Sequence, residues 1–122
     1  MFSNEIIEKV WEAGLIIEGV SKDLIRKDAC GAFIMKDHYG NHSSDFGWEI
    51  DLIVPEIIGG DASLENLRPL QWQNHDSKGN DYPVYFAVKK GQVSKNITVS
   101  RQLTVNAKLQ KALNSKYGIE NP

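Results

Sequence analysis

The chain has 122 residues, enough for one ordinary domain, and 41% of them are hydrophobic, which predicts a globular core and argues against global disorder. Cys30 is the sole cysteine, so an internal disulfide and a four-cysteine zinc site are excluded, and we expect a reducing, cytoplasmic environment. The N-terminus lacks a signal-peptide pattern, and no apolar run approaches the roughly 18 residues of a membrane span, so no membrane association is expected. The formal net charge of −2 gives no direct support for nucleic-acid binding.

The chain is expected to begin with an amphipathic helix. Ser3 can cap this helix, and Gly14 is placed to end it. Its apolar residues recur at helical spacing: Ile6, Ile7, Val10 and Trp11. Residues 15–31 give no clear pattern.

Two strands are expected next. The first covers residues 32–35 and the second covers 48–54, with turn-forming residues at 37–41 between them. Pro55 ends the second strand, and a glycine-rich loop follows at 59–61.

The segment after this loop is expected to be irregular over residues 64–70 and to contain a short helix over 72–79. Three leucines serve as apolar anchors of the irregular segment: Leu64, Leu67 and Leu70. Residues 84–88 and 97–99 are strand-like.

A final helix is expected to be capped by Thr104 and to end before Gly118. Its apolar face is formed by Val105, Leu109, Ala112, Leu113 and Tyr117. The expected order is therefore a helix, a hairpin with a long loop, a short helix, two strands and a closing helix. This is an α+β pattern, and we expect one domain over residues 1–122.

Charge is distributed unevenly along the chain. Residues 1–66 hold 13 Asp and Glu against 5 Lys and Arg, whereas residues 67–122 hold 3 acidic and 9 basic residues. The C-terminal half, with a balance of +6, is compatible with a polyanionic partner. A solvated basic surface explains the same asymmetry.

Three polar residues in the middle of the chain mark a candidate site, in which Asp51 and His75 are the expected metal ligands. Asp51 lies near the end of an expected strand, Asn66 follows the loop, and His75 lies on the short helix. A carboxylate on a strand and an imidazole on a following helix can share one divalent cation and leave positions open for water and phosphate. Such a centre suits phosphodiester chemistry, for which a separate base must activate water.

The stretch from Arg26 to Pro83 resembles the HNH endonuclease family. The resemblance is carried by residues 27–32, 39–41, 47–51, 53–55, 59–60, 64–70 and 72–78, which include Trp-Glu-Ile-Asp at 48–51, Gly-Gly at 59–60 and Leu-Glu-Asn-Leu-Arg-Pro-Leu at 64–70. It implies a ββα-metal core of a hairpin plus a short helix at about 26–83, one divalent ion (Mg²⁺ or Mn²⁺, with Zn²⁺ or Ni²⁺ as alternatives) and DNA as the partner.

The resemblance also implies roles for individual residues. Asp51 matches the metal-binding carboxylate, His75 the second metal ligand, and Asn66 the central asparagine that holds the loop and strand in register. Leu52 stands where the family has its general-base histidine. Since leucine cannot accept a proton, the site is expected to be inactive or impaired, and loss of a positioned base costs about 10²–10⁴ in rate.

Alternatives stay open for these residues. Leu52 fits a degenerate natural nuclease, an engineered inactivation or a core residue of a divergent fold. The functional alternatives to a DNA endonuclease are a nucleic-acid-binding module that has lost hydrolysis and a protein-interaction domain. The oligomeric state is not predicted.

Further candidates are basic and nucleophilic side chains. The residues expected to contact phosphates, or else only to keep the surface soluble, are Lys78, Lys89, Lys90, Lys95 and Arg101. His38 and His42 are candidate substitute bases, although solvated turn histidines are more common. Cys30 is expected to be a small core residue.

Overall fold

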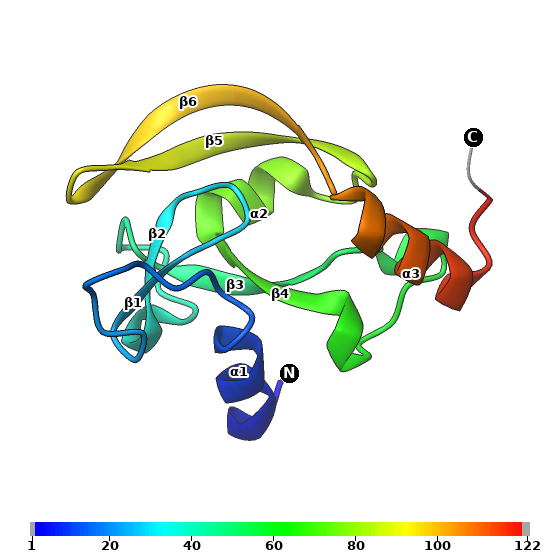
Figure 1. The fold of residues 1–122 in the computed structure, drawn as a ribbon, viewed down its shortest axis with the longest axis horizontal. Coiled ribbons are helices and arrows are strands. Elements are labelled where there is room, and N and C mark those ends of the chain that lie inside the picture. The colour runs from blue at the N-terminus through cyan, green and yellow to red at the C-terminus, as the bar shows by residue number, and fades with distance from the viewer. Residues whose placement is uncertain (1, 121–122) are drawn as a thin grey trace.

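The computed structural model describes residues 2–120 and confirms the α+β class. The elements are, in chain order, α1 (Asn4–Trp11), β1 (Ile25–Lys27), β2 (Phe33–Met35), β3 (Trp48–Leu52), β4 (Leu67–Gln71), α2 (Trp72–Lys78), β5 (Val84–Gln92), β6 (Lys95–Thr104) and α3 (Ala107–Tyr117). Short 3₁₀ turns lie at Lys36–His38, Glu56–Ile58 and Leu64–Asn66. In Figure 1 the β5–β6 ribbon arches over α2, and α1 lies on the opposite side of β3 and β4.

The strands form three antiparallel pairs: β1 with β2, β3 with β4, and β5 with β6. The two strands expected at 32–35 and 48–54 therefore do not pair with each other. The partner of the second is β4, in the segment that we expected to be irregular. All five β4 residues are buried, so no two-residue alternation marks the strand, and Pro69 is atypical of strand interiors.

Strand β1 lies in the stretch that gave no sequence pattern. It has three residues, and its central residue is a charged one, Arg26, which is 5% exposed. The Arg26 guanidinium donates hydrogen bonds to the carbonyls of Lys22, Glu12 and Gly14. Arg26 thereby ties the end of α1 and the following loop to β1, a role that periodicity cannot reveal.

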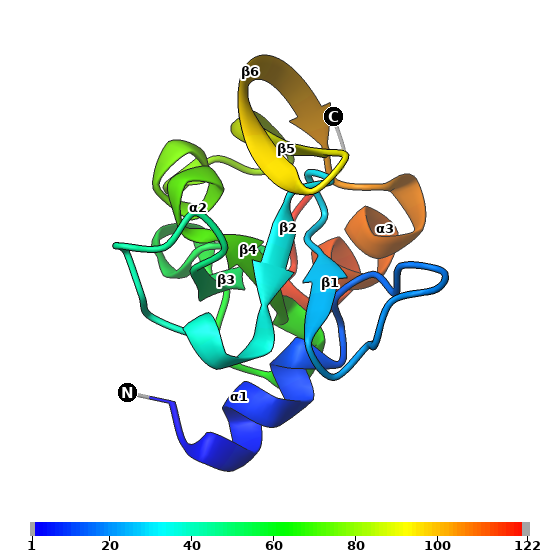
Figure 2. The same ribbon diagram turned by 90° about the vertical axis from the view of Figure 1, so that its left-hand side faces the viewer.

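The hairpin β3–β4 runs directly into α2, as Figure 2 shows. Trp48 pairs with Gln71 and Leu52 with Leu67 in this hairpin. Gln71 then starts α2, because its side-chain oxygen accepts hydrogen bonds from the amides of Gln73 and Asn74. The helix that carries His75 is therefore fixed to the end of β4.

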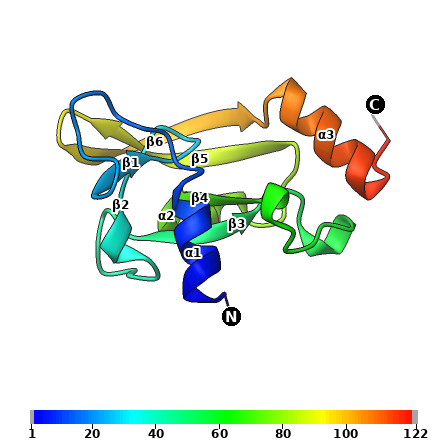
Figure 3. The same cartoon turned by 60° about the horizontal axis from the view of Figure 1, so that its bottom comes forward.

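Two apolar clusters pack on the hairpin. The first joins α1 to β3 and β4 and contains Val10, Trp11, Ile34, Trp48, Ile50 and Leu67. The second joins the hairpin to the β5–β6 ribbon and α3 and contains Cys30, Ile53, Val54, Leu70, Tyr85, Ala87, Val105 and Leu113. Figure 3 shows α3 at one end of the molecule and β1 and β2 at the other.

The helix ends differ from expectation in two details. Ser3 caps α1 by accepting a hydrogen bond from the amide of Ile6, as expected, but α1 ends at Trp11 and not at Gly14. Thr104 is the last residue of β6, and Asn106 caps α3. Among the described residues, no helix has the length and apolar character needed to cross a membrane.

Candidate functional site

A cavity of about 580 Å³ opens where β3 ends and α2 passes beside it. Its lining consists of Asp51, Leu52, Pro55, Glu56, Ile57, His75, Gly79 and Asn80. Three of the residues singled out in the sequence, Asp51, Leu52 and His75, therefore lie around one cavity. Asn66 is not part of its lining.

The two residues at the end of β3 differ in burial. Asp51 is 2% exposed, whereas Leu52 is partly exposed at the cavity and also packs against the first apolar cluster. Since successive side chains of a strand point to opposite faces, these two lie on different sides of β3. Leu52 thus lies at the cavity wall and beside the first apolar cluster.

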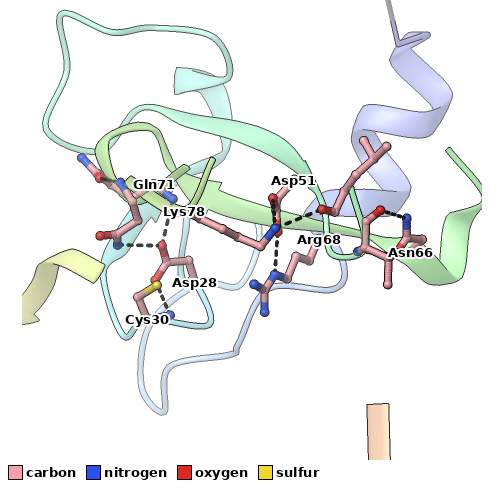
Figure 4. Close-up of polar contacts among 10 residues, drawn as sticks. Asp28, Cys30, Asp51, Asn66, Arg68, Gln71 and Lys78 are labelled. Carbon is pink, nitrogen blue, oxygen red and sulfur yellow. Dashed lines mark hydrogen bonds and ion pairs between the residues drawn. The ribbon is translucent and has the colours of Figure 1, made fainter. Parts of the chain in front are cut away.

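The Asp51 carboxylate is held between two buried cations, as Figure 4 shows. Arg68 Nε donates to Oδ2 at 3.0 Å, and Lys78 Nζ lies 3.3 Å from Oδ1. Lys78 Nζ also donates to the carbonyl oxygen of Leu52 at 3.2 Å. Lys78 comes from the last turn of α2, so this cluster joins the helix to the end of β3.

Burial and charge act against each other in this cluster. Burial lowers the pKa of Lys78, and the attraction of Asp51 only partly offsets it. Burial is the largest single influence on the pKa of Arg68 and lowers it, but Asp51, Tyr85 and Cys30 together outweigh burial and raise this pKa. Arg68 also lies over the Tyr85 ring, and its Nη2 is buried without a hydrogen-bond partner among the described residues.

A second buried carboxylate, Asp28, was missed by the sequence analysis. Its Oδ1 accepts hydrogen bonds from the amides of Cys30 and Ala32, and its Oδ2 accepts from the Gln71 amide and from Asn74 Nδ2. Burial nevertheless raises the pKa of Asp28. Asp28 therefore anchors the β4–α2 junction to the loop before β2.

Asn74 extends this network to β5. Its side chain accepts from the amides of Val88 and Lys89 and donates to the Lys89 carbonyl, at the irregular point of the β5–β6 register. In the sequence, the one sign of this role was that Asn74 is a polar residue directly before His75 on the expected short helix. Through Asp28 and Asn74 the position of α2 is fixed from two sides.

Asn66 holds the loop that follows β3. Its side-chain oxygen accepts from the Val54 amide at 2.8 Å, and its Nδ2 donates to the carbonyls of Val54 and Asp61 at 2.9 and 2.8 Å. The loop also needs Gly60, because a Cβ there would collide with the Val54 carbonyl. These contacts hold both ends of a loop whose residues 55–57 line the cavity.

The basic residues expected to contact phosphates do not share one environment. Lys78 has a side-chain exposure of 0%, so in this arrangement it is not available to a phosphate. Arg101 is half-buried and donates to the Cys30 carbonyl. Lys89 on β5 donates to Thr98, while Lys90 and Lys95 are exposed on the same ribbon.

The remaining candidates lie away from the cavity lining. His38 Nδ1 is 2.6 Å from the Ser44 hydroxyl. The His42 ring stacks on Trp72, and its Nε2 is 3.0 Å from a Glu49 oxygen. Cys30 is buried, and burial raises the pKa of its thiol to about 12, which makes it unreactive at neutral pH.

The donor set at the cavity is small. Within residues 2–120, no three His, Cys, Asp or Glu side chains form a group that could hold a metal ion. The cavity lining holds two carboxylates, Asp51 and Glu56, and one imidazole, His75, and the Asp51 carboxylate already faces two cations.

Comparison with known proteins adds no family assignment: no protein-family model, no curated protein and no solved structure matches this chain.

Proposed function

We propose that this chain is an HNH-type protein that binds DNA and, with Leu52 in place of the general base, does not cleave it. In this proposal β3, β4 and α2 correspond to the ββα unit of that family. The observation that supports it best is the placement of Asp51, Leu52 and His75 around one cavity between the end of β3 and α2.

In this proposal the absence of cleavage rests on Leu52, which stands where the resemblance implies the general base. Hydrolysis of a phosphodiester requires a group that takes a proton from water, and a leucine side chain has no lone pair to do so. His38 and His42 are engaged with Ser44 and with Glu49 and Trp72, away from the cavity lining. A loss of about 10²–10⁴ in rate is the typical cost of a missing base.

A divalent metal ion is the cofactor that the resemblance implies, and the residues as arranged do not fit it. An ion at Asp51 would stand beside the Lys78 ammonium and the Arg68 guanidinium, and like charges repel. Asp51, Glu56 and His75 all line the cavity, but within residues 2–120 they do not come together as a group that could hold a metal ion. The proposed binding activity therefore requires no metal.

DNA binding is assigned to the β5–β6 ribbon. Lys89, Lys90 and Lys95 lie on it, whereas Arg68, Lys78 and Lys116 are taken up by ion pairs with Asp51 and Glu65. Lysine contacts to phosphates release counterions, so affinity should fall with salt at a log–log slope of about −0.9 per contact.

Fluorescence anisotropy with a labelled duplex tests this assignment. The variant Lys89→Ala/Lys90→Ala/Lys95→Ala should bind more weakly and with a shallower salt slope than the wild type. Lys108→Ala/Lys111→Ala, which removes two exposed lysines of α3, is the control for loss of surface charge elsewhere and should bind nearly like the wild type. No binding by the wild type even at low salt would refute the proposal and favour a protein partner.

A metal-dependent DNA endonuclease is the second candidate, since the same cavity holds the positions of both expected ligands and of the base. Plasmid nicking in Mg²⁺ or Mn²⁺ tests it, with the wild type, Leu52→His and Leu52→Asn compared. Cleavage by the histidine variant alone supports nuclease ancestry, because asparagine is polar but is not a base. Strong cleavage by the wild type refutes the proposal that the chain with Leu52 does not cleave DNA.

A further inference from the structure

Lys78 has an environment that is unusual for a helical lysine. Its side chain is 0% exposed and its ammonium contacts two oxygens, one from the Asp51 carboxylate at 3.3 Å and one from the Leu52 carbonyl at 3.2 Å. Lysine is almost never fully buried unless it is paired. The ammonium thus occupies a place between a carboxylate and a strand-end carbonyl, which are the oxygen types that hard cations choose.

The position of Lys78 in the chain explains how it reaches this place. It follows His75 by three residues on α2, so both residues lie on neighbouring turns of one helix face. The helix that brings His75 to the cavity therefore also brings a fixed positive charge to Asp51. Figure 4 shows the Lys78 side chain running to Asp51, with Arg68 approaching from another side.

We infer that the Lys78 ammonium is the resident cation of the Asp51 carboxylate and that it excludes a divalent metal ion from it. A buried carboxylate without a partner is strongly disfavoured, and here Lys78 and Arg68 already supply that partner. An ion arriving at Asp51 must displace a buried, hydrogen-bonded ammonium and then remain next to it. At Asp51, the Lys78 side chain thereby takes the place of the metal ion that the resemblance implies.

This inference rests on the proposed metal-free function, and Mn²⁺ is the probe that tests it. Free Mn²⁺ gives a six-line electron paramagnetic resonance signal that weakens on binding, so occupancy can be titrated without DNA or activity. The wild type is expected to show no saturable binding. Lys78→Met, which keeps the stem and removes the charge, should show saturable Mn²⁺ binding, with a Kd at least about tenfold below the highest Mn²⁺ concentration at which the wild type shows none.

Matched variants separate this effect from others. Asp51→Asn/Lys78→Met should lose the gained binding, and Lys89→Met, which removes a lysine charge from the β5–β6 ribbon, should behave as the wild type. Lys78→Gln can still donate to the Leu52 carbonyl and serves as the second variant where Lys78→Met does not fold, as checked by circular dichroism.

Two results overturn the inference. One is saturable Mn²⁺ binding by the wild type that raises its Tm. The other is a folded Lys78→Met or Lys78→Gln protein with no gain in binding. DNA anisotropy on the wild type is independent of both, so loss of the proposed DNA function and loss of this inference can be told apart.

Discussion

Asp28 offers the sharpest test of how the helix that bears His75 is held in place. Its carboxylate is 0% exposed and accepts four hydrogen bonds, from the amides of Cys30, Ala32 and Gln71 and from Asn74 Nδ2. All four partners are donors, and an acceptor with two oxygens is what they require. Asp28→Ala would leave these donors without their partner.

The expected loss of stability is large. A buried donor left unsatisfied costs about 1–3 kcal/mol, so four such groups, with water replacing part of the loss, should cost about 3–6 kcal/mol. This is a substantial fraction of the free energy of unfolding of a typical domain, which is roughly 5–15 kcal/mol. Asp28→Asn should be destabilising too, because its amide NH₂ would face two donors.

Urea unfolding followed by tryptophan fluorescence measures both variants. Asp76→Asn, which changes an exposed acid of α2, is the matched control and should be within about 0.5 kcal/mol of the wild type. An Asp28→Asn protein as stable as the wild type would refute the reasoning, because it would mean that the position does not require a four-fold acceptor.

The pH dependence at Asp28 has a definite sign. Burial raises its pKa above 3.8, so the unfolded chain loses this proton at a lower pH than the folded chain. Ionisation in the folded protein carries a net burial cost that the four hydrogen bonds only partly offset, so stability is highest below the unfolded pKa and falls as pH rises through the folded pKa. The wild type should therefore lose stability relative to Asp28→Asn over that window, and parallel pH profiles would contradict this.

Two further substitutions test the loop and the last helix. Asn66→Ala removes three hydrogen bonds and should cost about 2–4 kcal/mol, with faster hydrogen exchange at the Val54 amide; unchanged exchange would show that Asn66 does not hold the loop. Asn106→Ala should cost about 0.5–2 kcal/mol through loss of the α3 cap, whereas Thr104→Ala, at the position expected from sequence, should cost less than about 0.5 kcal/mol; the reverse order in thermal unfolding would contradict the assigned cap.

Periodicity and capping residues were sufficient to predict most elements but not how the strands pair. The helix after Ser3, the strands near 32–35 and 48–54 and the short helix after Gln71 were each expected from local pattern. The strand β4 was not, because a strand buried on both faces has no alternation. Pairing depends on which apolar faces meet, and that information is not local.

The candidate site, too, was predictable only in part, because the local sequence does not show how distant elements pack. The order Asp51, Leu52, His75 along a strand, loop and helix indicated that they would approach one another, and the three line one cavity. The contact of Lys78 with Asp51 could not be predicted from the sequence, since a lysine near a helix C-terminus is ordinarily a surface residue. Only the packing of α2 on β3 turns that side chain inward, toward Asp51.

The site differs in two ways from the one that the resemblance implies: Leu52 replaces the base, and Lys78 takes the place of the metal ion. Together they predict a result that neither predicts alone. Leu52→His would supply a base, but Lys78 would still hold Asp51, so the single variant should nick plasmid DNA weakly or not at all in Mn²⁺. Leu52→His/Lys78→Met removes both obstacles and should be clearly more active, by about 10²-fold or more if the base acts at its usual strength. Melting curves must show both proteins folded, because the double variant loses a buried charge partner of Asp51. Full cleavage by Leu52→His alone would show that Lys78 does not keep the ion away, and Leu52 would then be the one obstacle to cleavage in the proposed function.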